Sequence, residues 1–509
     1  MSDKQIEPTR RTFLKSAALG VAACAAADAA GAAPPSRLPQ AHPEALGIDP
    51  AALIAFLSAV DKKPGGMHSF MLLRHGQAAA EGWWTPYGPS HPHMLFSLSK
   101  SFTSTAVGLA VSEGLLNVED RIVSFFPESL PPKMSKNLEA MRVRHLLTMT
   151  TGHDVDATGP TRAQADGDWV RGFLALPVEH APGAKFVYNS AATYMLSAIV
   201  QKLSGKRVLD YLTPRLFEPL GIEGPTWESC PKGIDTGGWG LSIKTEDIAR
   251  FGQLCLQKGH WHGRQVVPQT WIEEATHGHV SNGDPAAPSD WSQGYGYQFW
   301  RCRHDSYRGD GAFGQFCVVM PELDAVLAIT SGTGDMQAIL NAVWDHLLPG
   351  IHPAALPVSP VTKDLPQILG HLAIQLPEGH AVSPRSAEFS GKTYHFAPND
   401  LKLQSIMLTF GRDRCHVTLQ TEQGIQQREY GNKLWIEGEA NLEGTPSKQA
   451  AGRGIWTSED TYNAILCFYE TPFTQTVACT FAQDQVTVTI RQNVGFGPLE
   501  HPPLIGRSA

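Results

Sequence analysis

Ser97 and Lys100 stand three positions apart in the stretch MLFSLSKSFTS. On a helix, side chains three residues apart lie on one face, so the lysine amine can reach the serine hydroxyl. A serine hydroxyl is a good nucleophile only when a base removes its proton. Lysine can be that base if burial lowers its pKa, and the apolar neighbours Phe96 and Phe102 favour burial. The spacing therefore predicts nucleophilic catalysis by Ser97 with Lys100 as the base.

The same spacing occurs a second time, at Ser229 and Lys232. Pro231 stands between them, and a proline disfavours the helical turn that would bring the two side chains together. We therefore expect no catalytic pair there. Because the spacing alone is a weak signal, the alternative that Ser97 is a polar residue on the solvent face of a helix stays open at this point.

Helices and a hairpin must position the candidate pair. Apolar residues at helical spacing predict a helix over residues 97–113, and a second helix after Tyr188 that Ser190 caps and Gly205 ends. In residues 314–332, two apolar runs flank a turn-forming segment, which predicts a buried antiparallel hairpin. Helices mixed with antiparallel strands predict an α+β domain.

The chain of 509 residues is long enough for more than one domain, at roughly 100–200 residues each. A Pro-rich stretch separates an alternating helix and strand region from a tail of short β-branched and aromatic runs, which predicts a small β-rich domain. We expect a signal peptide at 1–33, a domain that carries Ser97 and Lys100 at 41–348, a linker at 349–384 and a β-rich domain at 385–509.

The first residues resemble an export signal. Arg10 and Arg11 precede a short run of small apolar residues, which is typical of a twin-arginine signal. Cleavage near residues 30–33 would give a periplasmic protein that the twin-arginine export machinery has carried. The segment VAAC, which ends at Cys24, resembles a lipoprotein box and favours a lipid anchor as the alternative.

Composition excludes several function classes. The net charge of −8 lacks the basic surplus that nucleic-acid binding requires. Beyond the signal, no segment reaches the about 20 apolar residues of an integral membrane span. The pairs His91 with His93 and His260 with His262 have no Cys or carboxylate cluster near them in the sequence, so we expect no metal site.

Several segments in a fixed order resemble a known superfamily. The segments are FSLSKSFTSTAVGLAVSEGLLNVEDRI, VRHLLTMTTGH, PGAKFVYNSAATYMLSAIVQKLSG, LGIEGPTWE, GGWGLSIKTEDIARFGQLCLQKGHW and DGAFGQFCVVMPELDAVLAITSG. Over residues 46–348 the chain resembles serine β-lactamases, penicillin-binding proteins and family VIII esterases, and above all their 6-aminohexanoate-oligomer hydrolase branch. The resemblance implies an antiparallel sheet flanked by helices, with an all-helical subdomain.

The resemblance also implies roles for further residues. Penicillin-recognising enzymes carry Ser-Asp-Asn after the Ser-x-x-Lys motif, and their esterase relatives carry Tyr-x-Asn. Here that place reads Tyr188, Asn189 and Ser190. The phenol of Tyr188 would relay a proton beside the lysine, and Ser190 or Asn189 would hold the lysine by hydrogen bonds.

The third motif of these enzymes, Lys-Thr-Gly, is absent, and GDGAFGQF takes its place. We expect this glycine-rich segment, at Gly314 and Gln315, to bind substrate and to supply one backbone N–H to the oxyanion, with the N–H of Ser97 as the second. The missing lysine puts β-lactamase and carboxypeptidase activity in doubt, since in the relatives that cation binds a substrate carboxylate.

We therefore expect a serine hydrolase that cleaves a small ester or amide through an acyl-enzyme on Ser97, without a metal or organic cofactor. Two other readings stay open. The chain could be a penicillin-interacting D-Ala-D-Ala peptidase or β-lactamase, which labelled penicillin would reveal. It could also be a non-catalytic binding protein on the same fold.

Overall fold

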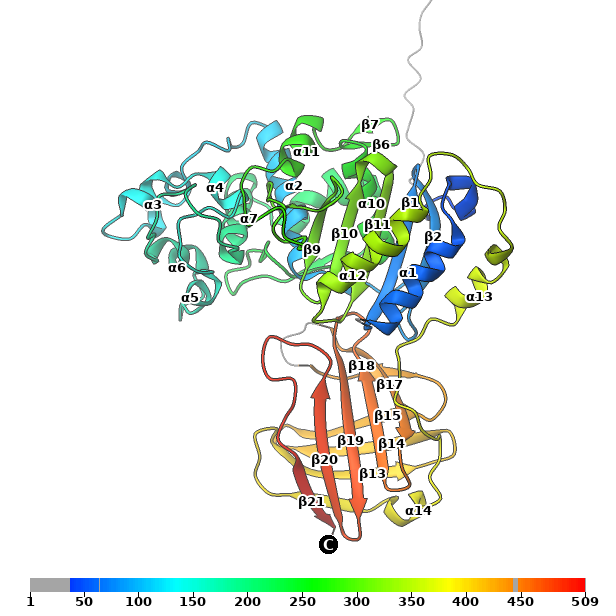
Figure 1. Ribbon diagram of the computed structural model, residues 1–509. Helices are drawn as coiled ribbons and strands as arrows, with labels where there is room; N and C mark the ends of the chain where they lie inside the picture. The colour runs from blue at the N-terminus through cyan, green and yellow to red at the C-terminus, as the bar shows by residue number, and fades with distance from the viewer. Residues whose placement is uncertain (1–36, 64, 443–446, 509) are drawn as a thin grey trace, which may run out of the picture. The chain divides into compact units, whose positions relative to one another are not determined.

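The computed structural model describes residues 37–63, 65–442 and 447–508. The predicted twin-arginine signal and lipid-anchor cysteine, both within residues 1–33, lie outside these described residues. Two antiparallel sheets dominate the described chain, one of six strands flanked by helices and one of ten strands at the C-terminal end (Figure 1). This combination confirms the predicted α+β class.

The six-stranded sheet forms the centre of the first part. In spatial order its strands are β2 (Gln77–Trp83), β1 (Met67–Arg74), β11 (Ala325–Ser331), β10 (Gln315–Met320), β9 (Tyr307–Gly311) and β8 (Trp300–Arg301). All neighbouring pairs are antiparallel. β10 and β11 form the hairpin that the sequence predicts.

Helices cover both faces of this sheet. α1 (Pro50–Lys62) and α12 (Met336–Ala342) lie across one face, and α10 (Thr245–Leu256) covers the other (Figure 1). Successive strand residues point to opposite faces, so Phe316 packs in the core beneath α1 while Cys317 packs in the core beneath α10. Because both faces of the sheet are buried, most residues in the sequences of β10 and β11 are apolar.

A mainly helical region lies between β2 and β8. Its helices are α2 (Ser99–Ser112), α3 (Lys136–Ala140), α4 (Val143–Leu147), α5 (Thr158–Arg162), α6 (Trp169–Ala175), α7 (Ser190–Ser204), α8 (Val208–Leu212), α9 (Glu218–Leu220) and α11 (Gln269–Thr276). Its short strands are β3 (His93–Met94), β4 (Thr226–Trp227), β5 (Leu241–Ile243), β6 (His260–Trp261) and β7 (Arg264–Gln265). The N-cap of α7 is Asn189, whose Oδ1 accepts from the N–H of Ala191 at 3.1 Å, so the predicted cap at Ser190 is one residue late. Gly205 ends α7 as predicted, with φ of 70°.

The ten-stranded sheet closes on itself. In chain order its strands are β12 (Thr393–Phe396), β13 (Leu403–Phe410), β14 (Arg414–Thr421), β15 (Gly424–Gly431), β16 (Ile436–Glu439), β17 (Gln449–Trp456), β18 (Thr461–Cys467), β19 (Thr474–Ala482), β20 (Gln485–Gln492) and β21 (Leu504–Ser508). A parallel pairing of the end strand β15 with β17, the neighbour of the other end strand β16, closes the sheet into a barrel at Gly431 and Arg453. The short helices α13 (Leu365–Gly370) and α14 (Ser386–Phe389) precede the barrel.

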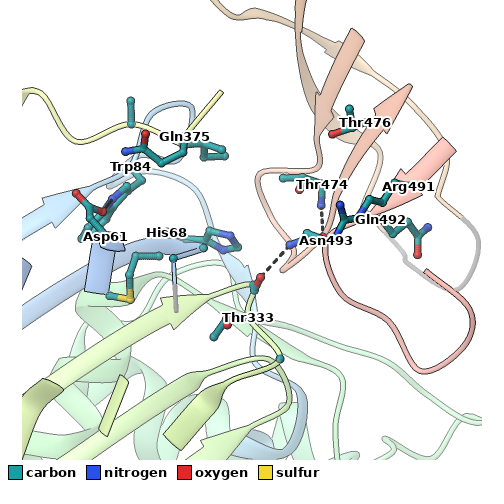
Figure 2. A pocket seen from close by; sticks show the side chains of 17 residues that line it. Asp61, His68, Trp84, Thr333, Gln375, Thr474, Thr476, Arg491, Gln492 and Asn493 are labelled. Carbon is teal, nitrogen blue, oxygen red and sulfur yellow. Dashed lines mark hydrogen bonds between the residues drawn. The ribbon is translucent and has the colours of Figure 1, made fainter. Parts of the chain in front are cut away.

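The barrel contacts the first part of the chain through backbone groups. Tyr87 Oη donates to the Thr471 carbonyl at 3.0 Å, and Asn493 Nδ2 donates to the Gly332 carbonyl at 3.0 Å. Figure 2 shows Asn493 beside a cavity of about 390 Å³, whose wall also includes His68. These bonds hold the loops that precede β19 and follow β20 against the segments that follow β2 and β11.

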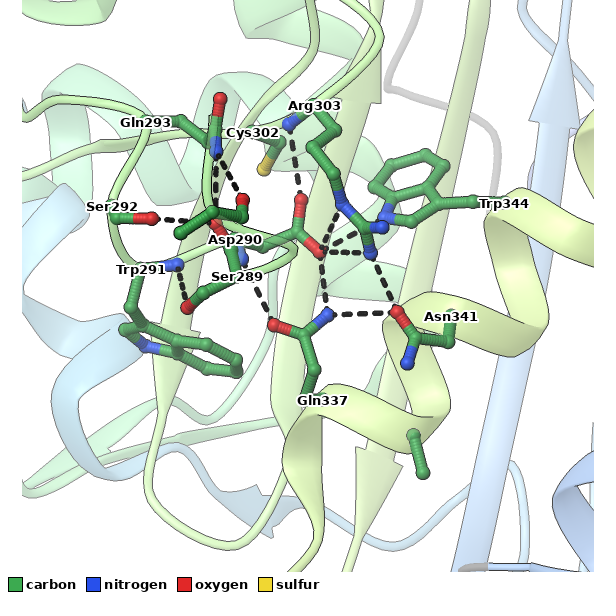
Figure 3. A network of polar contacts seen from close by, with 12 residues as sticks. Ser289, Asp290, Trp291, Ser292, Gln293, Cys302, Arg303, Gln337, Asn341 and Trp344 are labelled. Carbon is green, nitrogen blue, oxygen red and sulfur yellow. Dashed lines mark hydrogen bonds and ion pairs between the residues drawn. The ribbon is translucent and has the colours of Figure 1, made fainter. Parts of the chain in front are cut away.

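A buried carboxylate braces the loop that leads into β8. Asp290 accepts from Arg303 Nη2 at 2.8 Å, from Gln337 Nε2 at 2.7 Å and from Trp344 Nε1 at 3.0 Å (Figure 3). Burial alone would raise the pKa of Asp290, but these bonds to the ionised form outweigh burial and lower the pKa to about 2. The carboxylate is therefore charged in the folded protein and stabilises this loop.

Replacing Asp290 by asparagine is expected to lower the free energy of unfolding at pH 7 by about 3 kcal/mol, because Arg303 loses its buried partner. Since the folded-state pKa lies below the unfolded value, this stabilisation is present above about pH 4 and is lost as pH falls toward 2. Urea unfolding at pH 7 and pH 2.5 measures both effects. Exposed Asp345 changed to asparagine is the control, and equal stability of the two variants at pH 7 would contradict the account.

Candidate active site

Ser97 lies on a tight turn just before α2. The turn is a 3-10 helix over Phe96–Leu98, and α2 follows at Ser99, two residues later than the predicted helix start. Phe96 has φ of 47°, a left-handed conformation that costs energy for a bulky residue. The strained turn places Ser97 two residues before the N-terminus of α2, and Lys100 lies in the first turn of that helix.

Lys100 contacts three oxygen atoms from three parts of the chain. Its Nζ lies 2.9 Å from Ser97 Oγ, 2.9 Å from Ser190 Oγ and 2.7 Å from the Gly238 carbonyl oxygen. The side chain is 1% exposed. A neutral amine has two N–H donors and one lone pair. It can therefore donate to Ser190 and Gly238 while it accepts the Ser97 hydroxyl proton, which is the arrangement a general base needs.

Burial lowers the pKa of Lys100 to about 7, and the carboxylates of Asp156 and Asp310 partly oppose this shift. Asp156 accepts from the N–H of Ser190 at 3.2 Å. Asp310 is buried on β9 and accepts from Arg308 Nε at 2.9 Å. Near neutral pH a large fraction of Lys100 is therefore unprotonated.

Tyr188 is held against the lysine and the nucleophile. Its ring centre lies 4.9 Å from Lys100 Nζ, and it stacks on Trp300 with ring centres 5.3 Å apart. Burial raises the pKa of Tyr188 far above its ordinary value, although a hydrogen bond with Ser97 opposes the shift. Tyr188 is thus a neutral phenol, suited to donate or relay a proton rather than to act as the anionic base.

Gln315 pairs with Gly311 in the β9–β10 hairpin, and donation of its backbone N–H to an oxyanion stays a prediction. The Gln315 side chain is fully buried and donates to the carbonyls of Ala312 at 2.9 Å and Ser331 at 2.8 Å. Gly314, with φ of 93°, forms the turn before β10. A Cβ on Gly314 would collide with Ser331, so both residues shape the β9–β10 hairpin.

Gly311, at the end of β9, approaches Ser97 instead. A Cβ on Gly311 would overlap the Leu95 carbonyl oxygen and lie 3.1 Å from the Ser97 backbone nitrogen. Among the described residues, the N–H groups of Ser97 and of Ala312, which follows Gly311, form no hydrogen bond with the backbone outside helices and strands. Because the end of β9 lies against the turn that carries Ser97, these two N–H groups are the candidate oxyanion donors.

Replacing Gly311 by alanine is expected to lower kcat for ester hydrolysis about 10²-fold, because the methyl group pushes β9 away from the Ser97 turn. Steady-state kinetics with p-nitrophenyl butyrate measures the loss. The control is Gly438→Ala on β16, where an added methyl group meets no atom within 4 Å. Activity of Gly311→Ala within twofold of the parent protein would show that this close approach has no role.

Of the predicted site residues, the structure unites Ser97, Lys100, Tyr188 and Ser190. The Asn189 side chain instead caps α7, and its Nδ2 has no hydrogen-bond partner among the described residues. Sequence reasoning missed Gly238, Asp156 and Asp310. The Gly-Gly pair at 237–238 is a signal of close backbone approach, since a Cβ on Gly238 would meet the Ser190 carbonyl oxygen at 2.9 Å.

Four phenylalanines from both parts of the chain gather next to Ser97. The aromatic cluster consists of Phe96, Phe313, Phe473 and Phe496. Phe96 and Phe313 meet edge to face with ring centres 5.4 Å apart, and Phe496 lies 4.9 Å from Phe313. Phe496 belongs to the loop between β20 and β21 and is 79% exposed. The barrel therefore adds apolar surface beside the nucleophile turn.

No helix of the described residues has the length and hydropathy of a membrane span. The His, Cys, Asp and Glu residues of the same ranges form no group of three or more that could hold a metal ion.

Comparisons with known proteins show the family of this chain. A family model described as Beta-lactamase matches residues 58–344. The 6-aminohexanoate-dimer hydrolase of Paenarthrobacter ureafaciens is 25% identical over 303 residues, which cover 56% of this chain and 76% of that protein. The Beta-lactamase of Escherichia coli (strain K12) is 24% identical over 183 residues, which cover 32% of this chain and 47% of that protein.

Among solved structures, a beta-lactamase candidate from Bacteroides dorei DSM 17855 is similar in fold. It superposes with a TM-score of 0.50 and 15% sequence identity, and the match covers 59% of this chain and 99% of that chain. At this identity the likeness concerns the fold alone.

Proposed function

Because the chain belongs to the beta-lactamase family, whose members named above are hydrolases, we propose that it hydrolyses an ester or amide through an acyl-enzyme on Ser97. The observation that carries this proposal is the buried Lys100 amine, 2.9 Å from Ser97 Oγ and with its pKa lowered to about 7. On the solvent face of a helix, the partner lysine of Ser97 would have neither this burial nor three oxygen partners.

In the first step, neutral Lys100 takes the Ser97 hydroxyl proton while Ser97 Oγ forms a bond to the substrate carbonyl carbon. The carbonyl π electrons move to oxygen, and the N–H groups of Ser97 and Ala312 donate to the resulting oxyanion. Ala312 takes this role in place of Gln315, because it directly follows Gly311, whose backbone lies against the nucleophile turn.

In the second step, the oxyanion collapses and the bond to the leaving group breaks. The proton held by Lys100 passes to the leaving alcohol or amine, and Tyr188, which is hydrogen-bonded to Ser97, relays it. A water molecule then gives a proton to Lys100 as its oxygen attacks the acyl carbon. The second oxyanion collapses, the Ser97–acyl bond breaks, and Lys100 returns the proton to Ser97 Oγ as the carboxylic acid is released.

The surroundings of Ser97 favour neutral, apolar acyl groups. A β-lactam carries a carboxylate, which the lysine of the Lys-Thr-Gly motif binds in penicillin-recognising enzymes. In this chain the segment in place of that motif carries Asp310 and no lysine. Asp156 adds a second negative charge near Lys100. The aromatic cluster supplies apolar surface that suits an alkyl or aryl acyl chain. We therefore favour esterase or amidase activity over acylation by penicillin.

Purified protein is expected to hydrolyse p-nitrophenyl butyrate and to show little labelling by a fluorescent penicillin. The dimer of 6-aminohexanoate serves as the amide substrate, since a similar protein carries that activity in its name. Release of p-nitrophenol and of free 6-aminohexanoate measures the two reactions. Fast stoichiometric labelling by penicillin without ester turnover would favour the peptidase or β-lactamase alternative. Inertness to all three compounds would favour a non-catalytic binding protein.

A further inference from the structure

The barrel encloses a cavity of about 750 Å³, which falls in the range of small-molecule binding sites. Aliphatic side chains from several strands form most of its apolar wall, among them Leu408, Val417, Val477, Val488 and Ile490. Polar side chains such as Gln426, Gln475 and Lys448 form the rest of the lining. Protein interiors are close-packed, so a space of this size needs an explanation.

Packing elsewhere in the barrel shows that the cavity is not a general looseness of the fold. Phe389 and Phe481 stack with ring centres 4.5 Å apart, and Trp456 joins them in a continuous aromatic core. The barrel is therefore filled by these rings in one region and hollow in another. Small barrels with this arrangement hold a ligand in the hollow region.

A basic side chain faces the hollow region. On β15, Gln426, Arg428 and Tyr430 share the inner face, and the strand register places Arg428 opposite Val417. Arg428 donates to Gln426 Oε1 at 3.2 Å and forms a hydrogen bond with Tyr430. Its neighbour Glu429 lies on the outer face and pairs with other residues, so no carboxylate neutralises Arg428 from its own strand.

The charged side chains in the described lining of the cavity are all basic. Arg428, Lys448 and His501 line the cavity, and its described lining includes no aspartate or glutamate. Arg428 also forms no ion pair within the described ranges. An inward-facing guanidinium without a counter-ion among the described residues, next to an aliphatic wall, suits a ligand that has an anionic head and an alkyl chain.

We propose that the barrel binds an alkyl carboxylate of fatty-acid type, with the carboxylate on Arg428 and the chain against the aliphatic wall. This site is separate from Ser97 and does not rest on the proposed hydrolase activity. Recognition combines a charge-assisted hydrogen bond with burial of methylene groups, so affinity depends on both head and chain.

Isothermal titration calorimetry of the full chain with sodium decanoate, below its micelle concentration, tests the proposal. We expect one site, tighter binding of decanoate than of decan-1-ol, and a gain of about fourfold in affinity for each added methylene. Arg428→Gln is expected to weaken decanoate binding at least about tenfold and to leave decan-1-ol binding unchanged. The matched control is Arg414→Gln, because Arg414 lies on the outer face and pairs with Glu429.

A second variant tests the location without removing charge. Val477→Trp fills the cavity and is expected to abolish binding of both decanoate and decan-1-ol, with circular dichroism confirming that each variant is folded. The proposal is overturned if the parent protein does not bind decanoate, or binds it no better than decan-1-ol. It is also overturned if folded Arg428→Gln or folded Val477→Trp binds decanoate as tightly as the parent protein.

Discussion

Replacing Ser97 by alanine is expected to lower kcat/KM for p-nitrophenyl butyrate by about 10⁴-fold or more, because no other group at this position can form the acyl bond. The change removes one oxygen atom from the turn before α2 and leaves the oxyanion N–H groups in place. Binding of substrate should therefore survive while turnover is lost. Spectrophotometric assay of p-nitrophenol release measures the effect.

The chain supplies a matched control for this variant. Ser229 belongs to the second Ser-x-x-Lys match. Its Oγ donates to Asp235 Oδ1 at 2.9 Å, and the backbones of the two residues form an isolated antiparallel β-bridge. Ser229→Ala should keep full activity. Comparable activity of Ser97→Ala and Ser229→Ala would remove Ser97 from the mechanism.

Replacing Lys100 by methionine is expected to lower kcat/KM by about 10²- to 10⁴-fold, the usual contribution of a general base. Methionine fills the buried site without a proton acceptor, so Ser97 keeps its hydroxyl proton. In the parent protein the base must be neutral. With a pKa of about 7, kcat/KM should fall about tenfold for each pH unit below 7 and level off above it.

A pH profile from 5 to 9 tests the role of Lys100 more closely than the loss of activity does. The residual activity of Lys100→Met should lack the inflection near pH 7, while the control Lys232→Met should keep both the activity and the inflection. An unchanged profile in Lys100→Met would show that another group is the base.

Local sequence patterns predicted the parts of the site that lie close together in the chain. The three-residue spacing predicted the contact between Ser97 and Lys100. At the second match, Pro231 and Lys232 lie in a turn and not in a helix, as the proline predicted. Helix α7 and the β10–β11 hairpin follow from periodicity in the same way. The roles of Tyr188 and Ser190 were predicted from the family resemblance, which rests on the order of several segments and not on the spacing of two residues.

The parts that sequence reasoning missed depend on contacts between distant segments. Periodicity does not report that the Gly238 carbonyl reaches Lys100, or that Asp156 and Asp310 oppose the lowering of its pKa. Sequence reasoning did not single out Gly311, whose backbone lies against the Ser97 turn, because the residue that faces Ser97 depends on the turn between β9 and β10. The left-handed turn residues there, Phe313 and Gly314, set that register.

The most direct test of the account is to trap the acyl-enzyme. The protein is mixed with p-nitrophenyl butyrate, quenched in acid during the first turnover, and analysed by intact mass and peptide mapping. The account predicts one butyryl group per chain, located on Ser97, and none on Ser97→Ala. Turnover that leaves Ser97 unmodified while another residue carries the butyryl group would contradict it.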